Sequence, residues 1–182
     1  MRSMSLFMVL IGLVSCKPGG QSRIYSFIDY DTAKPHDLLN TSYSTIPVYD
    51  FDEFEKLLRV HPEKTYVVNF WATWCKPCVK EIPYFEKLQK DYRDLGVEVV
   101  LVSLDFPNRV EGQLLPFIEQ QELKSQIILL DDPNQNEWIP KVDKDWSGAI
   151  PATLIFNADK REFHEKSFTF ISLEAELQGF LN

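Results

Sequence analysis

Cys75 and Cys78 are the residues best suited to chemistry, because two cysteines separated by two residues can close a small disulfide. A β-branched and aromatic run at residues 67–71 precedes them, and an amphipathic helical pattern follows. This order places Cys75 at a helix N-terminus, where the positive end of the helix dipole favours a thiolate. The thiolate is the reactive form, and Cys-x-x-Cys settings lower the thiol pKa to about 3.5–7.5 from about 8.5. The pair therefore predicts a thiol–disulfide exchange site.

Two other uses of this cysteine pair stay open on the residues alone. A zinc site would need two more cysteine or histidine ligands. The remaining candidates have no ligand spacing: Cys16, His36, His61 and His164. Buried structural cysteines are the second alternative, but the intervening Lys76 and Pro77 suit a helix start better than a core. Redox chemistry is favoured over both, and no metal site is predicted.

The first residues predict export and a lipid anchor. Arg2 is followed by an apolar run at residues 6–14, which is typical of a secretory signal and too short for an ordinary membrane span. The run ends at Cys16 after Leu13-Val14-Ser15, and this ending resembles the bacterial lipobox, in which the cysteine is lipidated. We therefore expect a signal peptide at residues 1–15 and a membrane-anchored lipoprotein of the bacterial cell envelope, facing the periplasm or the surface. A simple signal peptide or a signal anchor is the alternative.

Length and composition predict one folded domain after this leader. The chain has 182 residues, of which 45% are hydrophobic and 25% are charged, enough for a single core. We expect the domain at residues 46–182 and a tether or N-terminal extension at residues 16–45. The net charge of −8 argues against a nucleic-acid partner, and membrane attachment is expected from lipid rather than from charge.

The cysteine pair is expected within a strand–helix–strand unit. Nearly continuous apolar runs at residues 65–71 and 97–104 predict buried strands, and the helical spacing between them predicts a helix over 76–93. Such a unit makes the two strands parallel. Further elements are expected as a helix capped by Asp50, a helix starting near Asn108, a strand at 127–130, a helix at 137–142, a strand after Pro151, a turn at 157–160, a second hairpin strand over 161–170 and a last helix capped by Ser172.

The motif residues resemble a known family. Trp74-Cys75-Lys76-Pro77-Cys78 follows Val68-Asn69-Phe70-Trp71-Ala72-Thr73, and Ile150-Pro151-Ala152-Thr153 lies far downstream. Together they resemble the thioredoxin fold, and more closely the TlpA/ResA-like membrane-tethered disulfide reductases of bacteria. The resemblance implies an α/β fold with a central mixed β-sheet flanked by helices, and an extra segment between about residues 106 and 146. It implies no organic cofactor.

The same resemblance implies a role for each matching residue. Cys75 would be the nucleophile that attacks a substrate disulfide, and Cys78 would resolve the mixed disulfide. Pro151 matches the family's cis-proline beside the active-site disulfide, and Ile150 would offer backbone groups to an extended substrate. Trp74 would shield one side of the motif, although simple packing is its alternative role.

One position departs from thioredoxin itself. Asn69 stands where thioredoxin has a buried aspartate that assists proton transfer, and an amide cannot take up that proton at neutral pH. Glu81, three residues beyond Cys78, matches the active-site glutamate of the TlpA/ResA-like group. The hypothesis is that Glu81 handles the proton of Cys78, and the alternative is an exposed helix carboxylate.

The function that the resemblance implies is reduction of disulfides in exported proteins, such as apocytochrome c, with electrons returned by a membrane electron donor. Three alternatives remain. The pair could act as a disulfide oxidant, because direction depends on the reduction potential. A thiol peroxidase is the second, although the Pro-x-x-x-Thr-x-x-Cys pattern is missing. The third is a lipid-anchored binding module in which the disulfide is structural.

Overall fold

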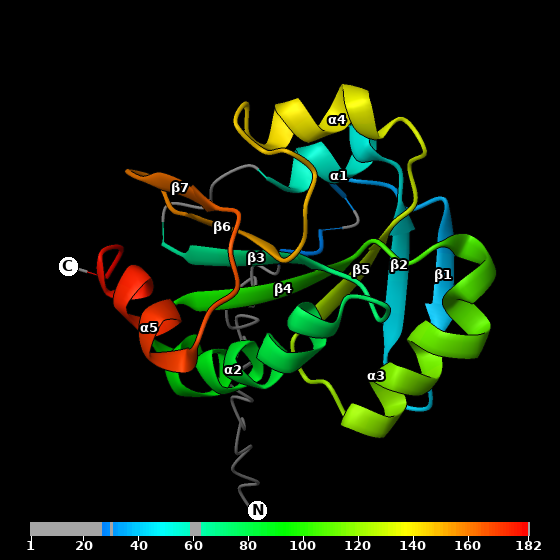
Figure 1. Cartoon of the computed structure of the whole chain (residues 1–182), viewed down its shortest axis with the longest axis horizontal. Coiled ribbons are helices and arrows are strands. Elements are labelled where there is room, and N and C mark those ends of the chain that lie inside the picture. Colours follow the sequence, from blue (N-terminus) through cyan, green and yellow to red (C-terminus); the bar gives the residue numbers. More distant parts are fainter. Residues whose placement is uncertain (1–26, 30, 59–62, 182) are drawn as a thin grey trace, which may run out of the picture.

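The computed structural model describes residues 27–29, 31–58 and 63–181, which form one seven-stranded sheet with helices on both faces (Figure 1). The strands are β1 (Asp37–Asn40), β2 (Thr45–Tyr49), β3 (Thr65–Trp71), β4 (Val97–Ser103), β5 (Gln126–Leu130), β6 (Ala152–Phe156) and β7 (Arg161–His164). The α-helices are α1 (Phe51–Leu57), α2 (Lys76–Tyr92), α3 (Leu115–Gln121), α4 (Gln135–Val142) and α5 (Phe170–Gln178). The strand order is β1-β2-β5-β4-β3-β6-β7, with β3 and β4 near the middle.

The sheet is mixed, as the thioredoxin-like resemblance implies. Strands β2, β5, β4 and β3 are mutually parallel, and β6 pairs antiparallel with β3. Two further antiparallel pairs, β1 with β2 and β7 with β6, form the edges. The predicted parallel pairing of β3 with β4 across the helix α2 is confirmed, so both strands end at the same edge of the sheet (Figure 1).

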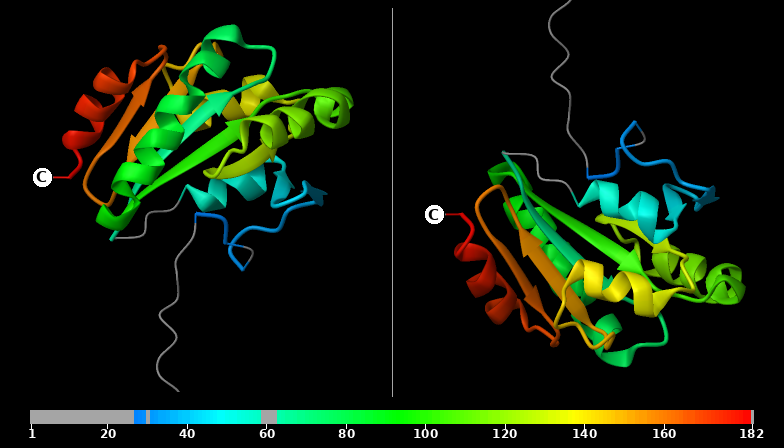
Figure 2. Two further views of the ribbon diagram at one scale, coloured as in Figure 1. Left: turned by 90° about the horizontal axis from the view of Figure 1, so that it is seen from below. Right: turned by 90° about the horizontal axis from the view of Figure 1, so that it is seen from above.

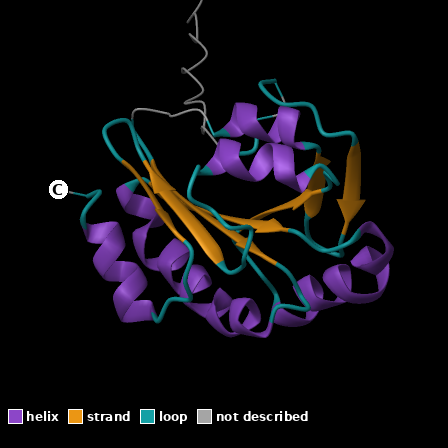
Figure 3. Cartoon of the chain, turned by 45° about the horizontal axis from the view of Figure 1, so that its top comes forward, coloured by secondary structure: helices purple, strands orange, loops and turns teal. Residues whose placement is uncertain are grey.

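The two faces of the sheet have separate cores. Helices α2, α3 and α5 cover one face, and α1 and α4 cover the other (Figure 2, Figure 3). Side chains of β3 alternate between them, with Val67 and Trp71 on the first face and Tyr66, Val68 and Phe70 on the second. Every residue of β3 and β4 is buried, which explains why these two strands are nearly continuous apolar runs.

Folded structure begins upstream of Ile46, where the sequence places the start of the domain. Strand β1 pairs with β2, and the ring of Phe27 is only 2% exposed, packed on Tyr66 with 5.3 Å between ring centroids. The backbone N–H of Phe27 also donates to the buried carboxylate of Glu98 at 2.6 Å. The described part of residues 16–45 is therefore packed against the sheet rather than a tether. The expected signal peptide and Cys16 lie outside the described residues.

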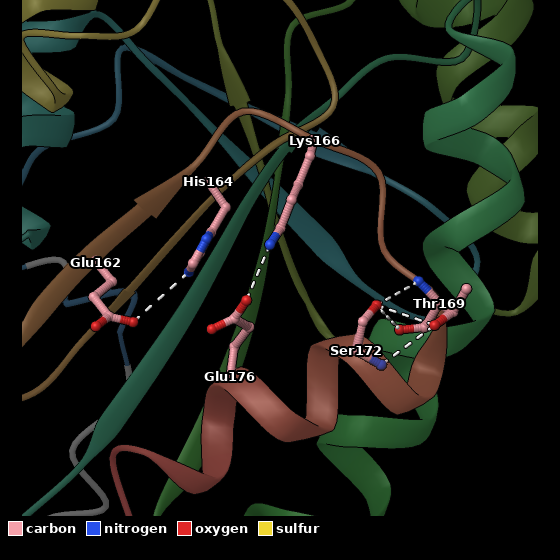
Figure 4. Close-up of polar contacts among 6 residues, drawn as sticks. All are labelled: Glu162, His164, Lys166, Thr169, Ser172 and Glu176. Carbon is pink, nitrogen blue, oxygen red and sulfur yellow. Dashed lines mark hydrogen bonds and ion pairs between the residues drawn. The ribbon is translucent and has the colours of Figure 1, made fainter.

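Two helix starts differ from the sequence expectation. The segment expected to begin near Asn108 is broken into a short 3-10 helix (Pro107–Arg109), a π-helix (Val110–Leu114) and then α3. The N-cap of α5 is Thr169 and not Ser172, so the prediction of a Ser172 cap is wrong. Ser172 is the reciprocal partner in a capping box. Its backbone N–H donates to Thr169 Oγ1 at 3.2 Å, and its Oγ accepts from the Thr169 N–H at 3.0 Å (Figure 4).

The cap of α1 and the turn after β6 match the sequence prediction, whereas one strand is shorter than predicted. Asp50 caps α1 by accepting from the Glu53 N–H at 2.9 Å, and the turn after β6 closes from Asn157 to Lys160. The second hairpin strand stops at His164, short of the expected residue 170. Among the described helices, none is long and apolar enough to cross a membrane.

Candidate active site

The cysteine pair lies at the junction between the end of β3 and the start of α2. Cys75 is the N-cap of α2, and its backbone N–H donates to Ala72 O at 3.1 Å in the tight turn after the strand. The two sulfurs are joined as a disulfide, and Cys75 Sγ accepts a hydrogen bond from the Cys78 N–H at 3.3 Å. This donor at the helix N-terminus is one that would stabilise a Cys75 thiolate after reduction. The site is therefore built for negative charge on Cys75.

The two sulfurs are not equally accessible. Cys75 is 5% exposed, whereas Cys78 has no exposed surface. A partner molecule can therefore reach Cys75 first, while Cys78 can act only on what is already bonded to Cys75. This asymmetry fits the nucleophile and resolving roles expected for the pair.

Ile150 and Pro151 lie beside the disulfide. The peptide bond between them is cis, as the resemblance implies, and β6 begins directly after it. The carbonyl oxygen of Ile150 lies 3.7 Å from Cys75 Sγ. Pairing of Phe70 with Ala152 holds this segment against the end of β3. An extended chain bound along Ile150 would thus pass next to the accessible sulfur.

Glu81 is a buried carboxylate beneath the pair. It lies one helical turn after Cys78 on the inward face of α2 and is 1% exposed, so the alternative of an exposed helix carboxylate is wrong. Its Oε2 accepts from the backbone N–H of Phe168 at 2.7 Å, and its Oε1 accepts from the Asn69 side chain at 3.1 Å. Burial raises the pKa of Glu81 to about 7, although both hydrogen bonds oppose the shift. This carboxyl group can bind and release a proton near neutral pH.

Asn69 is the side chain that fixes Glu81 in place. It is fully buried in β3, and its amide nitrogen reaches Glu81 Oε1, Thr153 Oγ1 at 3.1 Å and Ala152 O at 3.4 Å. Asn69 therefore links α2, β3 and β6 at one point. The sequence identifies it only as a departure from thioredoxin, although a polar residue inside an otherwise apolar strand signals such a role.

The loops after β3 and β4 form a second, unexpected part of the site. Buried Asp105 accepts from the Thr73 N–H, at 3.0 and 3.2 Å for its two oxygens, and from the Thr73 hydroxyl group. One residue further on in each loop, Trp74 stacks on Phe106 with 5.9 Å between centroids and 17° between planes. Trp74 and Phe106 are 51% and 56% exposed. The sequence does not single out Asp105 and Phe106, although they lie two and three residues after β4, a buried strand parallel to β3.

One group of potential metal ligands lies away from the cysteine motif in sequence. Ligand atoms of Glu162, His164 and Glu176 lie within 4.8 Å of one another on β7 and α5 (Figure 4). Lys166 Nζ already pairs with Glu176 at 3.0 Å and supplies the positive charge there. Desolvation lowers the pKa of His164 and so disfavours the charged form of its ring. We assign no metal to this group.

Comparison with known proteins agrees with this geometry. A family model described as the AhpC/TSA family matches residues 49–161. The thiol-disulfide oxidoreductase ResA of Oceanobacillus iheyensis is 47% identical over 121 residues, covering 65% of this chain and 56% of the relative. The same-named protein of Bacillus cereus is 30% identical over 124 residues, covering 68% of each.

A solved structure has the same fold. A thioredoxin-family thiol:disulfide interchange protein of Chlorobium tepidum matches with a TM-score of 0.55 and 21% identity, over 66% of this chain and 82% of that one. The family match covers more than half of the sequence and includes the strand, the cysteine pair and the cis-proline. The chain spans little more than half the length of its Oceanobacillus relative, and it belongs to the AhpC/TSA family, with its Cys75–Cys78 disulfide inside the segment that resembles the thiol-disulfide oxidoreductases.

Proposed function

We propose that this protein reduces disulfides in exported proteins, using Cys75 and Cys78 as its dithiol. The observation that carries the proposal is the unequal burial of the two sulfurs at the start of α2. Ile150 lies beside the accessible sulfur, and burial raises the pKa of Glu81 to about 7. The direction, from the protein to its partner, follows the resemblance to the TlpA/ResA-like reductases.

The first step is attack by the Cys75 thiolate on one sulfur of the partner disulfide. A bond forms between Cys75 Sγ and that sulfur, and the second partner sulfur leaves as a thiolate. The Cys78 N–H and the helix N-terminus stabilise the attacking anion before this step. Backbone groups of Ile150 hold the partner chain beside Cys75 while the mixed disulfide exists.

The second step is attack by Cys78 on Cys75 Sγ. Cys78 is fully buried, so its thiol must lose a proton to a neighbouring base before it can attack. Glu81, on the same inward face of α2, accepts that proton. The Cys75–Cys78 disulfide forms, the first partner sulfur leaves as a thiolate, and two electrons have passed to the partner.

We further propose that the domain works at the bacterial cell envelope, attached through a lipid on Cys16 and re-reduced by a membrane electron donor. The support is the sequence pattern of Arg2, the apolar run at residues 6–14 and Cys16. Mass spectrometry of the protein from membranes tests the anchor. A diacylglycerol-sized mass on a mature chain beginning at Cys16 is expected, and an unmodified cysteine would contradict it.

The exchange reaction is tested by the reduction potential of the Cys75–Cys78 pair. A value near −270 mV supports a reductase, and one near −120 mV means an oxidant. A pair that does not equilibrate with a dithiol buffer under native conditions would leave a structural disulfide. Hydrogen peroxide consumption by the reduced protein would instead indicate a peroxidase.

Two variants separate the roles of the cysteines. Cys78→Ser should trap a mixed disulfide between Cys75 and a partner, because the resolving thiol is gone. Cys75→Ser should trap nothing, because Cys78 is buried. Equal trapping by both variants would contradict the assigned order of attack.

A further inference from the structure

Two neighbouring loops are joined twice at the edge of the active site. Thr73 donates hydrogen bonds to Asp105, and the residues that follow these two, Trp74 and Phe106, stack on each other. One loop leads from β3 to the cysteine pair, and the other leaves the parallel strand β4. A partner that reaches Cys75 therefore comes close to Trp74, the residue before it, on which Phe106 stacks.

The polar contact is made by a carboxylate that is 2% exposed. Besides the Thr73 donors, Asp105 accepts from Ser103 Oγ at 2.9 Å, and its own N–H donates to Ser103 Oγ at 3.1 Å. All these donors are neutral, so the carboxylate is satisfied by fixed hydrogen bonds rather than by a mobile cation. Asp105 thus ties residue 73, and with it Trp74, to the loop that holds Phe106.

The aromatic contact faces solvent, unlike most large side chains here. Trp74 and Phe106 are about half exposed, while Trp71, Phe70 and Phe85 have no exposed surface. Trp74 directly precedes Cys75 in the chain, so the stacked pair lies at the cysteine motif, and neither ring carries a charge. Large exposed apolar groups at a reactive site mark a binding surface, and aromatic rings bind apolar side chains with little loss of side-chain entropy.

We propose that Phe106 is a specificity-determining residue, forming with Trp74 a platform that selects partner disulfides whose cysteine is flanked by a large apolar side chain. The occupant is an extended segment of an incompletely folded protein, because such side chains are buried once a partner has folded. Asp105 and Thr73 are positioning residues for this platform. The inference rests on the proposed exchange activity and names the class of substrate it prefers.

The test compares two peptides, each with one internal disulfide, that differ only in phenylalanine or alanine before the first cysteine. Rate constants are measured for their reaction with the reduced full-length protein, alongside oxidised glutathione. An aromatic contact of ordinary strength predicts a preference of roughly 2- to 12-fold for the phenylalanine peptide. Phe106→Ala should remove this preference, so that its rate constants for the two peptides become equal.

Ile171→Ala is the matched control, because Ile171 is also a large exposed side chain, at 79%, in the first turn of α5. It should keep the peptide preference. Wild-type protein that reacts equally with both peptides, or Phe106→Ala protein that keeps the preference, would overturn the platform. Failure to react with either peptide or with glutathione would overturn the exchange function itself.

Two variants at Thr73 test the positioning role. Thr73→Ser keeps the backbone and hydroxyl donors to Asp105, whereas Thr73→Val loses the hydroxyl. The valine variant should lose at least half of the peptide preference, and the serine variant should retain it. The glutathione rate reports whether each variant still folds and exchanges. Equal preferences in the two variants would remove Asp105 and Thr73 from the proposal.

Discussion

Replacing Glu81 with glutamine should remove a large pH-dependent part of the stability of the oxidised protein. The pKa of Glu81 is about 7 in the folded protein, against an ordinary value of 4.5. A carboxyl group with a raised pKa in the folded state holds its proton more tightly there. Its contribution to stability is therefore complete below pH 4.5 and is lost as the pH rises through about 7. The linkage relation gives a loss of about 2.5 kcal/mol between pH 5 and pH 8.

The measurement is urea unfolding of the oxidised wild-type and Glu81→Gln proteins at half-unit steps from pH 5 to pH 8. Other groups titrate in both proteins, so the informative quantity is the difference between the two unfolding free energies. That difference should favour the wild type by about 2.5 kcal/mol more at pH 5 than at pH 8. Glutamine fills the same volume, but its amide offers one acceptor where Glu81 uses two, so an additional loss independent of pH is also expected.

Glu111→Gln is the control for this measurement. Glu111 is an exposed carboxylate, so its replacement reports the effect of removing one negative charge from an acidic protein. A pH-independent difference between the wild type and Glu81→Gln would refute the reasoning. It would mean that burial does not raise the pKa of Glu81, and the proton transfer proposed for Cys78 would lose its base.

Three further predictions concern the fold and are measured by chemical denaturation. Thr169→Ala should lower stability by about 1 kcal/mol, more than Ser172→Ala, because Thr169 is the cap of α5. Phe27→Ala should lower the free energy of unfolding by about 3–5 kcal/mol, because the segment before residue 46 belongs to the core. A decrease below about 1 kcal/mol would mean that this segment is not part of the core. Gly96→Ala should cost at least about 1 kcal/mol, because φ is +81° and the added Cβ would lie 2.9 Å from the Glu63 carbonyl oxygen.

The sequence predicts the elements whose signals are local. Strand β3 is a long apolar run, and α2 has both helical spacing and a proline at its first turn, so their bounds are predicted within a residue or two. Strand β1 is missed because Asp37–Asn40 is short, mostly exposed and lies at the sheet edge, where no apolar pattern is required. The cap of α5 is misplaced by three residues because Thr169 and Ser172 both suit an N-cap.

The residues of the candidate site likewise divide into those with a local sequence signal and those identified only by contacts between distant segments. Adjacent motif residues identify Cys75 and Cys78, and the resemblance supplies Pro151. The burial of Glu81 is not visible in the sequence, because its hydrogen-bond partner Phe168 lies 87 positions away. The contact between Thr73 and Asp105 spans 32 positions and appears only when the two parallel strands are placed side by side.

The hydrogen bond between Phe27 and Glu98 attaches the N-terminal segment to one end of the sheet, and the disulfide lies at the opposite end. Glu98 lies at the beginning of β4, whereas the disulfide follows the end of the parallel strand β3. A seven-residue strand at about 3.3 Å per residue separates these ends by roughly 20 Å. If the protein is anchored at Cys16, as proposed above, the anchored segment would join the domain at the end opposite Cys75. With such an anchor, a longer segment between Cys16 and Phe27 would let Cys75 reach partners farther from the membrane.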